Sequence, residues 1–437
     1  MDFISDKQTT DELNLLGKYQ QGSVYSLFNK VKTDGGERLL ETMLRNPFSD
    51  VQNINQRSTV FKHFQQAGYS FPFEQETVSV FASWLDQGGS RSLVGAVISA
   101  SGKMMLSGLV RDERYGQMET GVRAAAQVIA NGHTFLSAIQ QPNPYEHRIK
   151  KIQEILFDKR LKKLSLLVKA PKITLKETAY YDHLLKRTLC KEMETFLAFI
   201  FEVDVYIAVG GVAKSKGFCY ATAEEKTNNH LKLKGLKHPS LEGAVGNDLM
   251  LDSSSNILFL TGANMAGKST LMKSIGIALY LAQAGFPVAA EQMSFSIKDG
   301  LYSSINVPDN ISLGYSHFYA EVLRVKQAAV LVSQRKNMLV MFDELFKGTN
   351  VKDAYEGTLE VTKAFAGYHN CLFIISTHII EVGEVLRQAA ERVQFCYMPT
   401  VMEGSRPRYT YRLAEGITSD RQGMMIIENE GILELLK

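Results

Sequence analysis

Two patterns of hydrophobic and polar residues divide the chain near residue 235. Before it, apolar residues recur at steps of three and four, as in residues 91–139, which is typical of amphipathic helices. After it come short runs that are apolar throughout, each followed by a loop and a helix-like segment, at residues 256–261, 337–344 and 371–377. Such runs indicate strands covered on both faces, as in a mainly parallel sheet. We therefore expect an all-helical domain over residues 1–235 and an α/β domain over residues 236–437.

Composition changes this picture little. The 437 residues, 45% of them hydrophobic, suffice for two or three domains with cores of their own. The four cysteines form no Cys-x-x-Cys pair, which excludes a zinc ribbon and indicates reduced thiols in the cytoplasm. The N-terminus is polar and acidic, so we expect no signal peptide. The most apolar window, residues 196–212, is interrupted by Glu202 and Asp204, which favours a buried helix over a membrane span.

The segment TGANMAGKST has the spacing of a phosphate-binding loop and lies between a predicted strand and a predicted helix. Backbone N–H groups of such a loop wrap phosphate, and the N-terminus of the following helix faces the anion. Lys268 should reach the β- and γ-phosphates of ATP, and the Ser269 hydroxyl should bind Mg²⁺. The alternative is a chance match in a glycine-rich turn, which the strand–loop–helix context disfavours. The expected nucleotide-binding residues are Gly262, Ala263, Asn264, Met265, Ala266, Gly267, Lys268, Ser269 and Thr270.

The next two apolar strands end in residues that suit ATP hydrolysis. Asp343 is expected to hold Mg²⁺, directly or through water, and Glu344 to orient or deprotonate the attacking water. His378 follows the third strand, at the edge where ligands of such sheets bind, so it is a candidate for sensing the γ-phosphate or positioning water. The alternatives are an exposed acidic turn and a histidine with a structural role.

Together these segments resemble the MutS family of DNA mismatch repair ATPases. The family loop reads TGxNMxGKST, and here it includes Asn264 and Met265, which phosphate binding in general does not require. In the similar segment DNISLGYSHFYAEV, Ser316, Phe318 and Glu321 match residues that complete the neighbouring subunit's site. Other similar segments are KHPSLE at residues 237–242, DELFKGTNVKDA at 343–354, STHIIEV at 376–382, and a closing strand and helix at 410–437.

The N-terminal part is similar to the start of the family's helical core. The residues that match in order are Thr33, Gly36, Arg38, Leu40, Pro47, Asp50 and Arg57. The resemblance implies an α/β P-loop ATPase domain preceded by an all-α core and lever domain. It further implies ATP and Mg²⁺ as cofactors, a catalytic set of Lys268, Glu344 and His378 with Ser316 acting across a homodimer, DNA as a sequence-independent partner, and repair proteins as further partners.

Parts of the family pattern are missing. The family's Phe-x-Glu mismatch reader has a counterpart only at residues 342–344, inside the predicted ATPase. Residues 58–235 look too few for core helices and an inserted DNA clamp. No nuclease module is recognised after the ATPase. We therefore expect a short form without the mismatch-reading domain.

Local departures also occur. Tyr315 and His317 flank Ser316 where the family has Arg-Ser-Thr, and Phe346-Lys347 stand where it has Gly-Arg. Gln422 stands where a histidine often contacts the base. These differences weaken the expectation of family-like communication between subunits and of adenine stacking.

Residues 148–187 hold 12 Lys or Arg and 4 Asp or Glu. Such a stretch can neutralise DNA phosphates without reading sequence, although charge runs are more often solvated helix faces. The sequence thus predicts a DNA-associated ATPase of mismatch repair or related repair, with no membrane association. The alternative is an ATP-driven remodeller of a ribosome or protein complex. A transporter-type ATPase is disfavoured, because no LSGGQ-like segment is present.

Overall fold

A computed structural model describes residues 3–17, 20, 22–87, 113–139, 143–263, 265–305, 317–389, 392–403, 406–418 and 435. Contacts divide the chain into two compact units. The sheet unit comprises Met1–Phe28, Met43–Thr59 and Val212–Lys437, and the helical unit comprises Asn29–Thr42 and Val60–Gly211. These units interleave along the chain, so they do not correspond to continuous ranges. The linear division at residues 235 and 236 stays a prediction.

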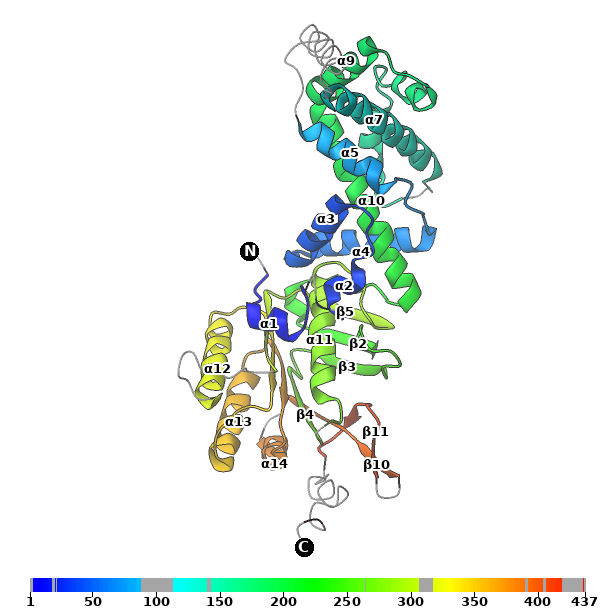
Figure 1. Ribbon diagram of the computed structural model, residues 1–437. Helices are drawn as coiled ribbons and strands as arrows, with labels where there is room; N and C mark the ends of the chain where they lie inside the picture. The colour runs from blue at the N-terminus through cyan, green and yellow to red at the C-terminus, as the bar shows by residue number, and fades with distance from the viewer. Residues whose placement is uncertain are drawn as a thin grey trace. The chain divides into compact units, whose positions relative to one another are not determined.

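Every regular element among the described residues of the helical unit is a helix (Figure 1). Three helices, α3, α4 and α10, continue from one unit into the other. The helices are α3 (Asp34–Arg45), α4 (Val51–Ala67), α5 (Gln75–Asp86), α7 (Glu113–Ala138), α8 (Glu146–Leu156), the 3₁₀ turn η1 (Leu164–Lys169), α9 (Leu175–His183), the π turn η2 (Leu184–Thr188) and α10 (Cys190–Lys216).

The two acids that interrupt the apolar window of α10, Glu202 and Asp204, are both bonded inside the helical unit. Asp204 holds Thr33, the residue before α3, since its Oδ2 accepts hydrogen bonds from Thr33 N at 2.8 Å and Thr33 Oγ1 at 2.7 Å. Glu202 pairs with Arg148 at 2.9 Å. Among the described residues, α10 is the one helix long and apolar enough to cross a membrane, but 67% of its apolar window is buried within the protein. It therefore has the character of a core helix.

The main sheet of the sheet unit has six strands in the order β12–β9–β4–β8–β7–β6. All neighbouring pairs are parallel except β12 with β9, so the expected mainly parallel sheet is present. The strands are β4 (Ile257–Gly262), β6 (Gly300–Ser304), β7 (Met338–Asp343), β8 (Leu372–Ser376), β9 (Val393–Met398) and β12 (Ala414–Glu415).

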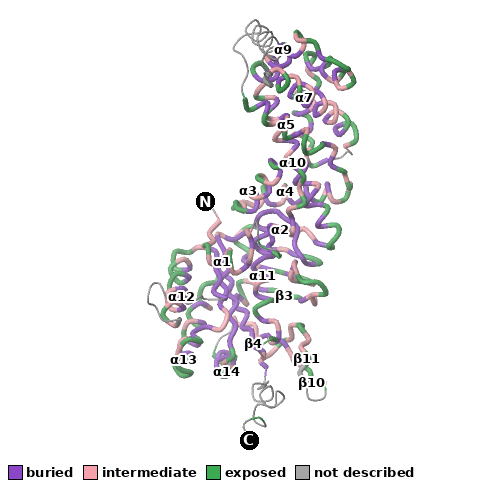
Figure 2. Tube along the Cα trace, viewed as in Figure 1, coloured by how far each residue is buried: buried purple, intermediate pink, exposed green. Residues whose placement is uncertain are grey.

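Helices cover both faces of this sheet. Alternate strand residues, such as Phe259, Phe342 and Phe373, form one core with residues of α12 (His317–Ser333), α13 (Val351–Ala366) and α14 (Ile380–Ala389), as the two-residue period of a strand requires. On the other face lies α11 (Lys268–Gln283), most of whose residues are buried (Figure 2). A Cβ added at its Gly276 would lie 2.6 Å from Met341 Cε of β7. The helix therefore packs closely on the sheet at this point.

A second sheet, which the sequence analysis did not predict, has the strand order β1–β5–β2–β3. Strand β2 pairs antiparallel with β3 and β5. Burial alternates along β3, so one face of that strand is covered and the other exposed. The remaining elements are β1 (Thr222–Glu224), β2 (Leu231–Leu236), β3 (Asn247–Leu251), β5 (Gln292–Ser296), the hairpin of β10 (Thr400–Glu403) and β11 (Arg406–Tyr409), α1 (Lys7–Glu12), α2 (Val24–Phe28) and η3 (Lys226–Asn228).

Candidate nucleotide site

The predicted phosphate loop and the two predicted polar strand ends meet at one edge of the main sheet. Strand β8 lies between β4 and β7, with Ser376 opposite Leu260 on one side and Asp343 on the other. Since the three strands are parallel, their carboxyl ends coincide, which is where ligands bind in such sheets.

Lys268 is buried against the backbone of the phosphate loop. Lys268 is 5% exposed, and its Nζ donates hydrogen bonds to the carbonyls of Gly262 at 2.8 Å and Ala263 at 3.1 Å. Burial lowers the pKa of Lys268, and the carboxylates of Asp343 and Glu344 oppose that shift. The charged ammonium is thus held by loop carbonyls and faces the two acids.

Gly267 shows why this loop needs glycine. Its φ is +103°, and a Cβ there would lie 3.1 Å from Cδ1 of Tyr411, so a side chain would be both strained and crowded. Met265 has a φ of +67° and is 78% exposed. Asn264 lies outside the described residues.

Asp343 receives two hydroxyl groups. Ser269 Oγ donates to its Oδ2 at 2.5 Å, and Ser376 Oγ donates to its Oδ1 at 2.5 Å. Hydroxyl and carboxylate oxygens are the ligands that Mg²⁺ prefers, and Mg²⁺ is commonly held by one or two carboxylates together with substrate phosphates. The residues therefore fit the ion. Ser376 was missed as a site residue, although its place before Thr377-His378 at a strand end was a usable signal.

Glu344 is held from two sides. His378 Nε2 and Glu344 Oε1 are hydrogen bonded, and Lys347 Nζ lies 3.4 Å from Glu344 Oε2. The bond from His378, against the opposing effect of burial, lowers the pKa of Glu344 to about 2. These two contacts fix the orientation of the Glu344 carboxylate just after the end of β7.

A cavity of about 430 Å³ lies beside the phosphate loop. Its lining includes His238 and Leu241 from the loop between β2 and β3, Gly267 and Thr270 from the start of α11, and Tyr411 after β11. Asn247 of β3 bonds to the chain that follows β11. Its Nδ2 donates a hydrogen bond to Tyr411 O at 3.0 Å, and its Oδ1 accepts one from Leu413 N at 2.6 Å. A volume of this size and its aromatic wall suit a flat ligand group.

Comparison with known proteins shows which family this part of the chain resembles. Residues 258–434 match the family model of MutS domain V. Over this range the chain is similar to the MutS family. It is 34% identical over 191 residues to the DNA mismatch repair protein MutS of Symbiobacterium thermophilum, which covers 42% of this chain and 21% of that protein.

Two further MutS proteins give the same result. That of Geobacillus thermodenitrificans is 28% identical over 246 residues (55% of this chain and 26% of that protein), and that of Chlorobium phaeobacteroides is 26% identical over 269 residues (60% and 30%). The chain thus spans less than a third of the length of these curated relatives. The similarity to parts of MutS proteins shows no particular substrate.

The MutS segment expected to complete a neighbouring subunit's site is described only in part. Ser316 lies outside the described residues. Phe318 packs edge-on against Phe346, with 6.1 Å between the ring centres, and Gly348 N donates a hydrogen bond to Glu321 Oε2 at 3.5 Å. Phe318 and Glu321 therefore contact the loop that follows β7 of their own chain.

Two departures from the MutS pattern bear on the candidate site. Lys347, in the altered Phe346-Lys347 pair, contributes its charge to Glu344. Gln422, expected opposite the base, lies outside the described residues. Tyr411, which the sequence analysis did not select, supplies the aromatic wall of the cavity instead.

Proposed function

We propose that this protein is an ATPase that converts ATP and water to ADP and phosphate. The observation that carries the proposal is the Ser269–Asp343 hydrogen bond at 2.5 Å, which joins the phosphate loop to the acidic strand beside the Glu344–His378 pair. MutS domain V as the matching family supports it. No other group of described residues combines a phosphate loop, a Mg²⁺ ligand pair and a water-orienting acid.

Each residue has a role that its contacts support. Lys268 leaves its loop carbonyls to contact the β- and γ-phosphates, since the phosphate oxygens are better partners for an ammonium. Ser269 and Asp343 would hold Mg²⁺, which would neutralise charge on the phosphates. Glu344, fixed by His378, orients the attacking water. Backbone N–H groups of Gly262 to Thr270 wrap the phosphates.

The cavity beside the loop takes the base of the nucleotide. Tyr411 offers a ring for stacking. Burial, with a contribution from Lys273, lowers the pKa of His238, which favours its uncharged form in the cavity wall. Adenine fits such a wall because it is flat and uncharged.

The nucleotide cycle drives a switch between two copies of the chain on DNA, in mismatch repair or related repair in the cytoplasm. Ser316 acts across a homodimer, and repair proteins are further partners. DNA binds to the basic stretch, residues 148–187, whose cations fall into two groups. Arg148, Arg160 and Lys186 pair with acids of their own unit, whereas Lys159, Lys162, Lys163, Lys169 and Lys172 are exposed.

A steady-state ATPase assay tests the enzyme. Wild type should hydrolyse ATP with Mg²⁺, and Lys268→Ala should weaken nucleotide binding and abolish turnover. Lys326→Ala, at an exposed position of α12, serves as the control. Equal activity of Lys268→Ala and wild type would refute the proposed site.

A binding assay over a series of salt concentrations tests whether the protein binds DNA. Duplex, mismatched and branched DNA should bind with an affinity that falls as salt rises, and Lys162→Glu with Lys163→Glu should reduce the magnitude of the log–log slope by about 2, roughly one for each phosphate contact. DNA that neither binds nor stimulates ATP turnover would favour the alternative, a remodeller of a ribosome or protein complex.

A further inference from the structure

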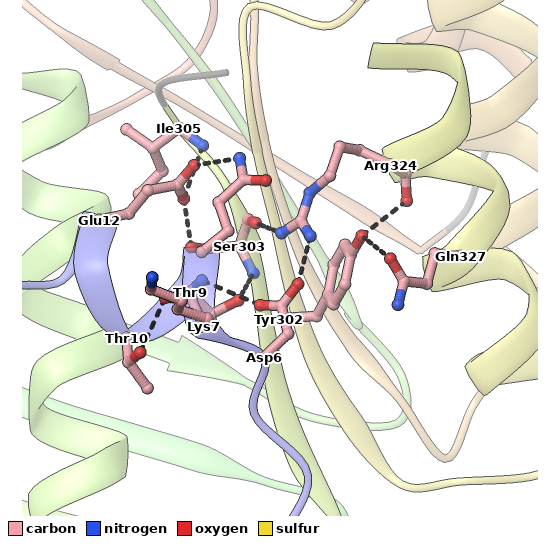
Figure 3. A network of polar contacts seen from close by, with 11 residues as sticks. Asp6, Lys7, Thr9, Thr10, Glu12, Tyr302, Ser303, Ile305, Arg324 and Gln327 are labelled. Carbon is pink, nitrogen blue, oxygen red and sulfur yellow. Dashed lines mark hydrogen bonds and ion pairs between the residues drawn. The ribbon is translucent and has the colours of Figure 1, made fainter. Parts of the chain in front are cut away.

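The N-terminal segment Ile4–Glu12 lies along the outer edge of β6, the last strand of the main sheet (Figure 3). Ile4 forms a parallel bridge with Gly300. Its N–H donates to Asp299 O at 2.8 Å, and its carbonyl accepts from Leu301 N at 2.9 Å. An edge strand otherwise presents a row of unpaired N–H and C=O groups. The segment thus begins as a one-residue strand beside β6.

Side chains of α1 continue the pairing that Ile4 begins. The outward N–H groups of β6 recur at every second residue, at Leu301, Ser303 and Ile305. Ser303 N donates to Thr9 Oγ1 at 3.0 Å, and Ile305 N donates to Glu12 Oε2 at 3.0 Å. A hydroxyl and a carboxylate therefore stand in for the carbonyls of a neighbouring strand.

Glu12 collects more than one donor. Ser303 Oγ also donates to Glu12 Oε2, and Gln8 Nε2 donates to Glu12 Oε1 at 2.8 Å. Both ends of the carboxylate are thus occupied, which fixes the side chain between α1 and the end of β6.

The same segment also holds α12. Arg324 of α12 is 8% exposed and donates hydrogen bonds to Asp6 and to the carbonyl of Ser303 (Figure 3). Its guanidinium lies 4.0 Å from the ring centre of Tyr302, whose hydroxyl donates to Arg324 O at 3.1 Å. Burial works to raise the pKa of Asp6, but hydrogen bonds with Arg324 and Thr9 outweigh it and lower the pKa.

Residues 305–316 connect β6 to α12. The segment contacts Ile305 at the start of this connection and Arg324 beyond its end. Leu13, the next residue, reaches the helix that follows the phosphate loop, since a Cβ at Gly276 would lie 3.0 Å from Leu13 Cδ1. Residues 4–13 therefore contact β6, α12 and α11.

We propose that Ile4–Glu12 is a working part of the ATPase, in which Glu12 and Asp6 are positioning residues that fix β6 against α12 during turnover. This inference rests on the proposed function. The plain alternative is a cover that protects a sheet edge and adds only stability.

Steady-state kinetics separate the two. Glu12→Ala should lower kcat about tenfold and leave KM for ATP within about twofold, because the lost contacts lie outside the nucleotide site. Asp11→Ala is the matched control, since Asp11 is an exposed acid of the same helix. Glu12→Gln should restore turnover, because one amide oxygen can accept both bonds that Glu12 Oε2 accepts.

Asp6→Asn provides a milder variant. Asp6 caps α1 by accepting a hydrogen bond from Thr9 N at 2.9 Å, and asparagine caps a helix equally well. The substitution therefore keeps the helix and removes the charge opposite Arg324. It should lower kcat by about threefold, in the direction of Glu12→Ala.

Melting temperatures and hydrogen exchange complete the test. If Glu12→Ala and Asp6→Asn melt earlier but turn over ATP like wild type, the segment is an edge cover and the inference is wrong. If wild type itself does not hydrolyse ATP, the proposed function fails. Amide hydrogen exchange then still tests whether Glu12 fixes β6 against α12. The amides of Ser303, Ile305 and α12 should then exchange faster in Glu12→Ala than in Asp11→Ala, and equal exchange overturns the inference.

Discussion

At the scale of single residues, the site depends on pairs of polar groups that order each other. Asp343 is held by the hydroxyls of Ser269 and Ser376, and Glu344 is held by His378 and Lys347. The sequence analysis placed Asp343, Glu344, His378 and Ser269 at strand or helix ends. It did not foresee Ser376, although the place of this serine at a strand end was a usable signal, or Tyr411, which nothing local marks as facing a ligand.

Glu344→Gln should retain ATP binding and lower turnover by about 100-fold or more, since a neutral amide orients water less well than a carboxylate. Single-turnover hydrolysis and nucleotide affinity measure the two effects separately. Glu356→Gln is the control, because Glu356 is 61% exposed and makes only a 3.9 Å pair with Lys352. Unchanged turnover in Glu344→Gln would remove Glu344 from the mechanism.

Lys298 predicts a pH dependence of stability. It is fully buried, with Nζ donating to Asn229 Oδ1 and, at 3.0 Å, to Asn337 Oδ1. Burial lowers its pKa from 10.5 to about 7. Between these values the unfolded chain binds more protons than the folded one, so the free energy of unfolding should rise with pH from about 7 to 10.5.

Urea unfolding across this pH range checks the prediction. Lys298→Met should be less stable at high pH but should lose the rise, whose size is at most a few kcal/mol since one pKa unit corresponds to about 1.4 kcal/mol. Lys232→Met, at an exposed strand position, should keep it. The same slope in Lys298→Met and wild type would contradict the assignment.

At the scale of elements, the spacing of apolar residues along the chain predicted which segments are helices and which are central strands. The apolar runs at β4, β7 and β8 are buried on both faces, as expected of central parallel strands. The second sheet was not predicted. Its strand β3 is only five residues long and alternates buried and exposed positions, which is a weak signal beside the loops that flank it.

The contact between Ile4 and β6 makes an element-scale prediction. A Cβ at Gly300 would lie 2.4 Å from Ile4 O, so Gly300→Ala must push the two backbones apart and should cost roughly 1–3 kcal/mol of stability. Gly211→Ala, in an open and exposed position of α10, should instead stabilise by about 0.5–1 kcal/mol. Thermal or urea unfolding measures both, and a Gly300→Ala variant as stable as wild type would argue against the close contact.

At the scale of the whole molecule, the expected homodimer rests on Ser316 acting across subunits. If it does, Ser316→Ala should lower ATP turnover by about tenfold or more, and wild-type turnover per chain should rise with protein concentration as dimers form. Mixing Ser316→Ala with Lys268→Ala tests this directly, because a mixed dimer regains one intact site. Turnover that is unaffected by Ser316→Ala at every concentration would exclude the trans role.

The sequence by itself predicted the local chemistry of this protein. The phosphate loop, the acids at the end of β7 and the histidine after β8 were predicted from short motifs and from strand ends, which depend on near neighbours in the chain. Only the tertiary structure decided which strands are adjacent, that Ser376 and Tyr411 join the site, and that residues 4–12 take the place of a strand beside β6. The physical reason is that these contacts join residues up to about 300 positions apart, and no local pattern records which distant backbone group a side chain will meet.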